Sequence, residues 1–336
     1  YPAIHGNNNV EVYYNIDTSL PASLPSNKAN KELEEVFNMN TVHMVLMEKG
    51  LDGKEKSEML KKIEDVDGVQ WALGLNSFVG PSFPESMIPK DVRSLLESDN
   101  YELQFICSEY RSATDEVNQQ ISAIQDIVKK YSPKGMVIGE APLMKDLADV
   151  TDVDLKNVNV ISIAAIFVII MIVFKSLSLP FILVAVIEFA IFVNMAVPYY
   201  QGITLPFVAG IVIGAIQLGA TVDYAILMTS RYQRERHLGK GKKEAISIAH
   251  RTSMKSIIIS GCSFFAATFG VGLYSQVDMI SSICTLLSRG AVISTVVVLL
   301  VLPAMFMIFD PIICHTSIGF LPKKEKEDPA GRSNKK

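Results

Sequence analysis

Apolar residues gather in the second half of this chain of 336 residues. Five apolar runs cover approximately residues 158–174, 179–198, 204–229, 256–274 and 283–309. Each run is close to the roughly 20 residues that an α-helix needs to cross a bilayer core of about 30 Å. The pattern therefore predicts an all-α transmembrane domain of five helices over residues 157–314.

The first 156 residues have the shorter pattern of a soluble domain. We expect helices at 27–38, 53–65 and 114–131, and strands at 41–48, 69–74, 101–108 and 135–140. From the first strand onward the order is β-α-β, a proline-rich loop at 80–89, and β-α-β again, which is typical of a ferredoxin-like βαββαβ fold. The loop either caps the sheet or contacts a ligand, and we favour capping. The predicted fold class is an α/β domain at 1–156 followed by the helical bundle.

Lysine and arginine are distributed asymmetrically among the connecting segments. The connection at 230–255 has eight of them and the tail at 315–336 has six, whereas the turns at 199–203 and 275–282 have none. Basic loops stay on the cytoplasmic side of a membrane. We therefore expect the loop 230–255 and the basic tail to be cytoplasmic in the plasma membrane. Since five crossings are an odd number, residues 1–156 are then extracytoplasmic.

Export of such a domain requires a signal before it. The first residues, YPAIHGNNN, contain no apolar segment. We expect that a preceding membrane segment is missing from the sequence. The alternative is a mature N-terminus left by a signal peptidase.

Composition and motifs narrow the classes of function. The net charge of −4 says little about partners, because charge is segregated along the chain. Cys107 is the one cysteine within residues 1–156, so that domain contains no internal disulfide. The sequence contains no Gly-x-Ser-x-Gly, no His/Cys metal spacing and no P-loop. His5 and His43 are isolated, with a structural or solvated role. We therefore expect no enzyme, no catalytic or metal-binding residue, no cofactor and no nucleic-acid partner.

Asp223 stands inside the third apolar run, next to Tyr224. An aspartate near the centre of a spanning helix costs about 2.5–3.5 kcal/mol to insert, and such residues mark functional sites. Asp223 precedes Arg231 by eight residues, which is about 12 Å along a helix, so its short side chain does not reach the membrane surface. A buried carboxylate takes up a proton readily, and a neighbouring phenol can tune that equilibrium. The alternative is an aspartate that only hydrogen-bonds a neighbouring helix.

Other residues of the apolar runs are candidates for supporting roles. Small residues admit a close helix, and we assign helix packing to Gly210, Gly214 and Gly219. Polar residues that could couple to the site are Glu188, Gln217, Thr221, Ser260 and Ser263. For Glu188 a structural hydrogen bond is an equal alternative, and serine hydroxyls commonly bond their own helix. Arg289 could pair with Asp278 or with lipid headgroups.

Three segments together resemble one family of transporters. They are IQLGATVDYAILMTSRYQRER at 216–236, the small-residue helix at 259–272, and the RGAVIS…VLPAMF pattern at 289–306. With an α/β domain before five helices, they are similar to the MMPL branch of the resistance-nodulation-division (RND) transporters. Members of that family are usually two similar halves, and this chain looks like a C-terminal half without its first helix.

The resemblance implies a function and partners. Asp223 and Tyr224 would be one of two Asp-Tyr pairs that relay protons, and the other pair would come from the missing N-terminal half or an equivalent second copy. This chain alone should then not transport. The whole protein would use the proton-motive force to export a hydrophobic or amphiphilic substrate, a lipid or a drug, from a membrane of lipids. The alternative is a non-transporting, RND-like lipid-sensing or partner-binding module.

Overall fold

The computed structural model describes residues 2–15, 19–75, 77 and 90–321. Its chain divides into two compact units. The sheet unit contains residues 13–154 with 276–278, and the helical unit contains residues 1–12, 155–275 and the chain from 279 onward. The proline-rich loop at 80–89 and the basic tail from 322 lie outside the described residues.

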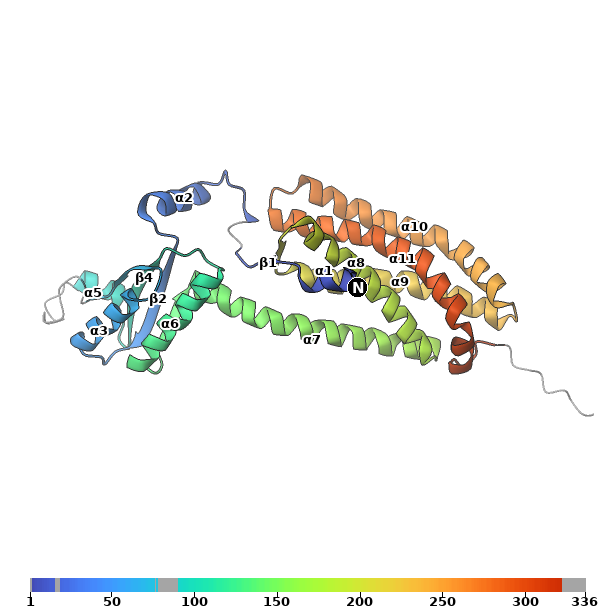
Figure 1. Cartoon of the computed structure of the whole chain (residues 1–336), viewed down its shortest axis with the longest axis horizontal. Coiled ribbons are helices and arrows are strands. Elements are labelled where there is room, and N and C mark those ends of the chain that lie inside the picture. The colour runs from blue at the N-terminus through green and yellow to red at the C-terminus, as the bar shows by residue number, and fades with distance from the viewer. Residues whose placement is uncertain (1, 16–18, 76, 78–89, 322–336) are drawn as a thin grey trace, which may run out of the picture. The chain divides into compact units, whose positions relative to one another are not determined.

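The chain is mostly helical, and five of its helices are long and apolar enough to cross a membrane. They are α7 (Glu140–Phe174), α8 (Ser178–Gln201), α9 (Ala209–His237), α10 (Lys242–Tyr274) and α11 (Asp278–Thr316) (Figure 1). Each contains most of one predicted run, but the boundaries differ. Helix α10 begins at Lys242 rather than near residue 256, because no glycine or proline interrupts the polar stretch after Gly241. Helix α9 begins at Ala209, because Leu205–Pro206 form the short strand β6.

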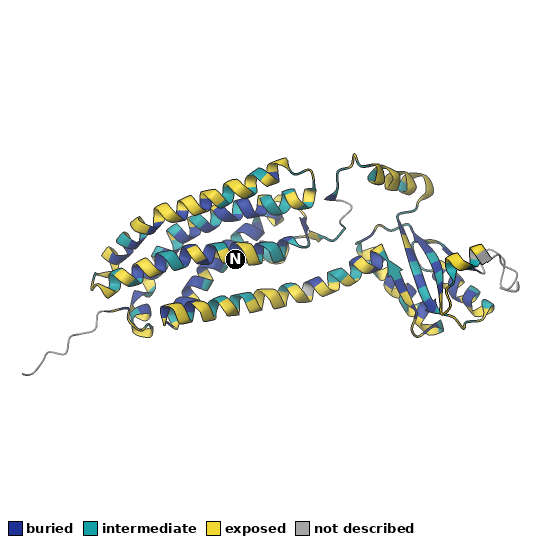
Figure 2. Ribbon diagram, turned by 180° about the vertical axis from the view of Figure 1, so that it is seen from behind, coloured by how far each residue is buried: buried dark blue, intermediate teal, exposed yellow. Residues whose placement is uncertain are grey.

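The helices of the helical unit differ in how much of their surface the chain covers. In α8, 56% of the most apolar stretch is buried, against 11% in α7 and in α10. Figure 2 shows the long exposed faces of α7 and α10. The short helix α1 (Pro2–Asn8) packs on the end of α8, where Tyr200 Oη donates to Pro2 O at 3.0 Å. Beside it, Leu205 N donates to Glu11 O, next to the short strand β1 (Val12–Tyr13).

The turn between α7 and α8 is tied to the end of α11. Lys175 adopts a positive φ of 47°, which turns the chain sharply after α7. Its carbonyl accepts a hydrogen bond from Ile318 N, and Ser176 bridges to Ser317. Phe320, which follows, is fully buried in the core of the helical unit. The last described residues are therefore part of the packed bundle.

The sheet unit contains one four-stranded antiparallel sheet in the order β3-β4-β2-β5. Its strands are β2 (Thr41–Glu48), β3 (Val69–Leu73), β4 (Tyr101–Ser108) and β5 (Met136–Gly139). Helix α3 (Gly53–Glu64) joins β2 to β3, and α6 (Asp115–Tyr131) joins β4 to β5. Helix α2 (Pro25–Phe37) precedes the sheet, and α5 (Lys90–Leu96) precedes β4. The longest pairing runs from Thr41 opposite Ser108 to Glu48 opposite Tyr101.

Alternation along the strands builds the core of the sheet unit. Val45, Met47 and Ile106 lie on one face and are almost completely buried. They pack against apolar residues of α3 and α6, including Met59 and Ile124. Both helices have N-terminal caps, since Asp52 forms a capping box with Glu55 and Thr114 Oγ1 accepts from Val117 N.

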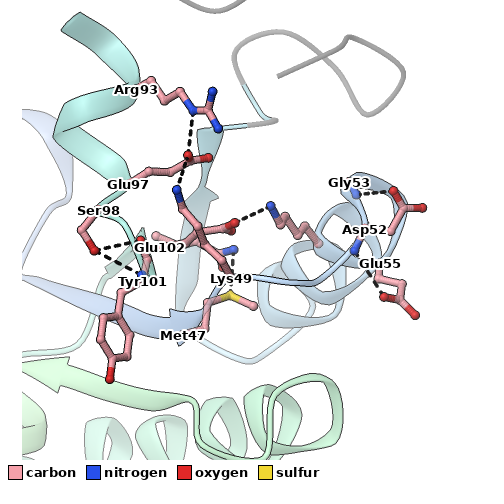
Figure 3. Close-up of polar contacts among 12 residues, drawn as sticks. Met47, Lys49, Asp52, Gly53, Glu55, Arg93, Glu97, Ser98, Tyr101 and Glu102 are labelled. Atoms are coloured by element: carbon pink, nitrogen blue, oxygen red, sulfur yellow. Dashed lines mark hydrogen bonds and ion pairs between the residues drawn. The ribbon is translucent and has the colours of Figure 1, made fainter. Parts of the chain in front are cut away.

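Ion pairs with buried carboxylates join the end of the sheet to the neighbouring helices (Figure 3). Lys56 Nζ of α3 lies 2.7 Å from Glu102 Oε1 of β4, and both side chains are less than 10% exposed. Glu97 accepts from Arg93 at 2.8 Å and lies 3.0 Å from Lys49 Nζ. Burial alone would raise the pKa of Glu97, but these two cations hold it below its usual range.

His43 is fully buried on β2. Its Nε2 lies 3.2 Å from Gln120 Oε1, and Gln120 Nε2 donates to Asp67 O. Since an amide oxygen only accepts, Nε2 carries a proton. A second proton on Nδ1 would be buried without an acceptor among the described residues, which favours the neutral ring. Burial lowers the pKa of His43, although the bond to Gln120 acts in the opposite direction.

We expect acid to destabilise the sheet unit through His43. The unfolded histidine binds a proton near its ordinary pKa of 6.5 and the folded one does so only at lower pH, so stability is full above 6.5 and falls below it. The free energy of unfolding should therefore fall between pH 7.5 and pH 5. Trp71, the one tryptophan of the chain, lies in β3 and reports unfolding of this unit by its fluorescence. The loss should shrink in His43→Gln and persist in His315→Gln, which changes an exposed histidine.

Candidate functional site: polar residues of the helical unit

The structure does not bring Asp223 and Tyr224 together. Adjacent residues of a helix point about 100° apart. Asp223 is exposed on α9, whereas Tyr224 is 5% exposed and belongs to the core of the helical unit. Within the described part of the chain, Asp223 has no hydrogen bond or ion pair. Its carboxylate therefore lies on the surface of the chain and not in its interior.

Two faces of α9 carry its small residues. A side chain at Gly210 would meet Leu155 of α7 at 3.4 Å, and one at Gly214 would meet Asn159 at 2.9 Å. These two glycines therefore permit the close approach of α7. Gly219 lies on the other face, where a side chain would meet nothing within 4 Å. Gly219 therefore packs against no helix among the described residues.

We define the α9 open strip as Ala215, Ile216, Gly219 and Asp223, which are all exposed on α9. Three of its members are an alanine, a glycine and the aspartate, with the carboxylate at one end. Small side chains at this spacing leave room for the backbone of another helix. The open strip thus combines an unpartnered acid with a surface that admits close packing.

Gln217 and Thr221 point away from the open strip, into the bundle. Gln217 Oε1 accepts from Asn194 Nδ2 of α8 at 2.8 Å, and Gln217 Nε2 donates to Ser294 Oγ of α11 at 3.1 Å. Thr221 Oγ1 donates to the same serine oxygen at 2.8 Å. These side chains are at most 1% exposed. We call Asn194, Gln217, Thr221 and Ser294 the amide network; it joins three helices through α9.

Gly290 of α11 makes room for the amide network. A Cβ there would lie 2.7 Å from both Asn194 Nδ2 and Gln217 Oε1, closer than real Cβ atoms approach polar atoms. Two buried amides and two hydroxyls satisfy one another across α8, α9 and α11, as polar groups within a membrane helix bundle must. Sequence reasoning missed Ser294 as a member of the amide network. The signal available in the sequence was its position four residues after Gly290, which places both residues on one face of α11.

The remaining predicted sites are not gathered around Asp223. Glu188 is half-buried on α8 and has no hydrogen bond or ion pair to another described residue. Ser260 and Ser263 are exposed on α10, and Ser263 Oγ donates to Ile259 O of its own helix at 2.8 Å. Asp278 accepts from Tyr13, and Arg289 bonds Asn194 instead of Asp278.

Another acid of the helical unit, Asp310 of α11, was not found from the sequence. Asp310 Oδ1 accepts from Tyr232 Oη of α9 and lies 3.0 Å from Arg236 Nε; Arg236 Nη2 donates to Oδ2 at 3.1 Å. Tyr232 is fully buried, and its ring stacks on Phe306 at 4.8 Å. We call Tyr232, Arg236 and Asp310 the end clamp, because it joins the last turns of α9 to α11. The sequence did contain a signal for this residue, because an acid directly follows the apolar run that ends at residue 309.

Within the described ranges, no three His, Cys, Asp or Glu residues are grouped as they would be around a metal ion.

The model of the MMPL family matches residues 18–326 of this sequence. The chain belongs to the MMPL family. This MMPL chain is 26% identical over 260 residues to the putative membrane protein YdgH of Bacillus subtilis, covering 75% of the chain and 28% of that protein. It is 24% identical over 200 residues to the probable transport protein MmpL9 of Mycobacterium tuberculosis, covering 57% and 21%. For the siderophore exporter MmpL5 of the same species the identity is 23% over 199 residues, covering 57% and 20%.

These relatives fix the general class of the protein. It is a multi-pass membrane protein whose family relatives include transport proteins. The matched regions span 20–28% of the length of these relatives.

Loss of the acid in the end clamp should destabilise the helical unit. Asp310→Ala removes the counter-charge of the partly buried Arg236 and leaves the buried Tyr232 hydroxyl without its acceptor, which should cost about 1–3 kcal/mol. The side chains of Arg236 and Asp310 are 14% and 8% exposed. Helix content followed during denaturation in detergent measures the effect. Glu244→Ala removes an exposed acid from α10 and should change stability by less than about 0.5 kcal/mol. Equal stability of the two variants would contradict the assignment.

Proposed function

We propose that this chain is one half of an exporter driven by the proton-motive force, with Asp223 and Tyr224 as its proton relay. The substrate is hydrophobic or amphiphilic, a lipid or a drug. The partner is an N-terminal half or an equivalent second copy that supplies another acid-phenol pair. The competing proposal is a non-transporting module that senses lipid or binds a partner.

The observation that carries the proposal is the open carboxylate of Asp223. A charged side chain within an apolar helix surface is costly unless it is protonated or paired. This chain provides no partner among the described residues, yet the open strip around Gly219 permits a second helix to approach closely. A site assembled from two halves, in which Asp223 takes up and releases a proton, accounts for both features.

The opposite face of α9 offers a route from protonation to movement. Gln217 and Thr221 bond α8 and α11, so a shift of α9 must be followed by those helices or must break buried hydrogen bonds. A proton that crosses the membrane down its potential releases about 2.3 kcal/mol per 100 mV. Neutralisation of Asp223 can thereby favour one of two packings of the bundle.

The sheet unit supports the assignment of a porter domain. Its strand order, with one helix joining β2 to β3 and another joining β4 to β5, corresponds to a split βαβ or ferredoxin-like arrangement. The sheet also exposes apolar side chains: Val42, Tyr101 and Met136 are 37%, 44% and 49% exposed. Such a surface suits an apolar substrate or the matching domain of the other half.

We expect Asp223→Asn to abolish export that depends on a pH gradient, because an amide neither binds nor releases the proton. The intact protein is reconstituted in liposomes, an inward proton gradient is imposed, and efflux of a fluorescent amphiphile is measured against empty liposomes. Glu244→Gln, which neutralises an exposed acid of α10, is the matched control and should transport normally. Unchanged efflux in Asp223→Asn would exclude the relay. Absence of efflux from the unaltered protein would favour the non-transporting module.

Labelling tests the proposed orientation independently of transport. Cysteine is introduced at Lys129 of α6 or at Lys243 of α10, both exposed, in a chain whose four native cysteines are replaced by serine. In intact cells a membrane-impermeant maleimide should react with the cysteine at 129 and leave that at 243 unlabelled until the cells are opened. The reverse pattern would place the sheet unit in the cytoplasm.

A further inference from the structure

An arginine interrupts the exposed apolar face of α11. Val292, Val296 and Leu300 recur at helical spacing and are 47%, 48% and 68% exposed. Arg289 belongs to the same stripe, three residues before Val292, and is half-buried. It is the one charged residue between Asp278 and Asp310. A charge in this place requires an explanation, because intramembrane arginines are costly unless they are paired.

One edge of the Arg289 guanidinium is fixed by α8. Nε donates to Asn194 Oδ1 at 2.8 Å, and Nη2 donates to Asn194 O at 2.9 Å. Asn194 is itself held in place, since its Nδ2 donates to Gln217 Oε1 and to Leu286 O. The arginine is therefore attached to the amide network, and its orientation is set by buried bonds.

The other edge of the guanidinium remains unused. A guanidinium has five N–H donors, and the two bonds to Asn194 engage one on Nε and one on Nη2. The described residues provide neither a further acceptor nor a carboxylate in ion-pair distance of Arg289. Both bonds go to uncharged oxygens, so the positive charge is oriented but not compensated. A planar fork of this kind matches the oxygens of a phosphate or a carboxylate.

The position of Arg289 along the bundle indicates the source of the anion. Asn194 precedes the end of α8 by seven residues, which is about 10 Å. Tyr199 and Tyr200 occupy the last turn of α8, and such aromatic residues lie at the level of the lipid headgroups. Side chains lean toward the N-terminus of their helix, and α11 begins at the end of the bundle where α8 ends. The long side chain of Arg289 therefore extends toward the headgroup level.

We propose that Arg289 binds the phosphate of a membrane lipid, whose acyl chains lie along the apolar stripe of α11. The charge of the guanidinium is compensated by the phosphate, Asn194 sets the direction of the donors, and Val292, Val296 and Leu300 contact the chains. The site is independent of Asp223 and does not require that the protein transports anything.

The test compares lipids with the same acyl chains and different headgroups. Purified intact protein in detergent is incubated with dioleoyl phosphatidylglycerol, with dioleoylglycerol or with inorganic phosphate. Native mass spectrometry measures bound lipid, and the thermal midpoint measures stabilisation. Phosphatidylglycerol should bind and raise the midpoint, whereas the other two should not. Arg289→Gln should weaken phosphatidylglycerol binding by about tenfold or more, the effect of losing a charge-assisted hydrogen bond. Arg289→Lys should retain more of the binding than Arg289→Gln.

The control is Arg251→Gln, which removes the same charge from an exposed position of α10 and should leave binding unchanged. Equal binding in Arg289→Gln, or an equal loss in Arg251→Gln, would overturn the site. If Arg289→Gln does not fold, the comparison of lipids on the unaltered protein still tests the proposal. Binding of dioleoylglycerol as tight as that of phosphatidylglycerol would show that the phosphate is not recognised. Binding of inorganic phosphate as tight as that of the lipid would identify a soluble anion instead. No stabilisation of the unaltered protein by phosphatidylglycerol would overturn the proposal.

Discussion

Polar side chains within an apolar bundle must find partners inside it, and α9 organises the helical unit around this requirement. Water is absent from the bilayer core, so an amide or hydroxyl without a partner there loses its hydrogen bonds outright. Helix α9 turns Gln217 and Thr221 toward Asn194 and Ser294, and it turns Tyr232 and Arg236 toward Asp310. These bonds determine which face of α9 is inside. The same rotation leaves Asp223 on the outside.

Asp310 and Asp223, two of the acids in the five long helices, have opposite surroundings. Asp310 is enclosed, with a phenol and a guanidinium on its oxygens, so its charge is stabilised within the chain. Asp223 has neither. The end clamp therefore suits a structural role, and Asp223 suits a role that depends on what is placed beside it.

Periodicity predicted the elements better than it predicted contacts. Strands 41–48 and 101–108 have the expected bounds, because strict alternation places one set of side chains on the buried face. Five membrane helices follow from the length of the apolar runs alone. The start of α9 was wrong because the run includes Pro206, which interrupts the helical pattern. Asp310 was missed because the apolar run stops one residue before it, although the helix continues to Thr316. The sequence placed Asp223 and Tyr224 side by side, and the structure adds that Asp223 is exposed whereas Tyr224 is buried, since neighbours on a helix point in different directions.

Gly290 shows how closely the outside of the bundle depends on its inside. Arg289, which precedes Gly290, places a cation at the surface. Because Gly290 has no side chain, the amides of Asn194 and Gln217 fit beside it in the interior. Asn194 serves both, since it holds the guanidinium with its oxygens and Gln217 with its nitrogen. A substitution that alters the hydrogen bond between Asn194 and Gln217 therefore also changes the direction of the Arg289 side chain. The surface arginine and the interior amides are therefore linked through Asn194, and a substitution at Asn194 removes the hydrogen bonds of both.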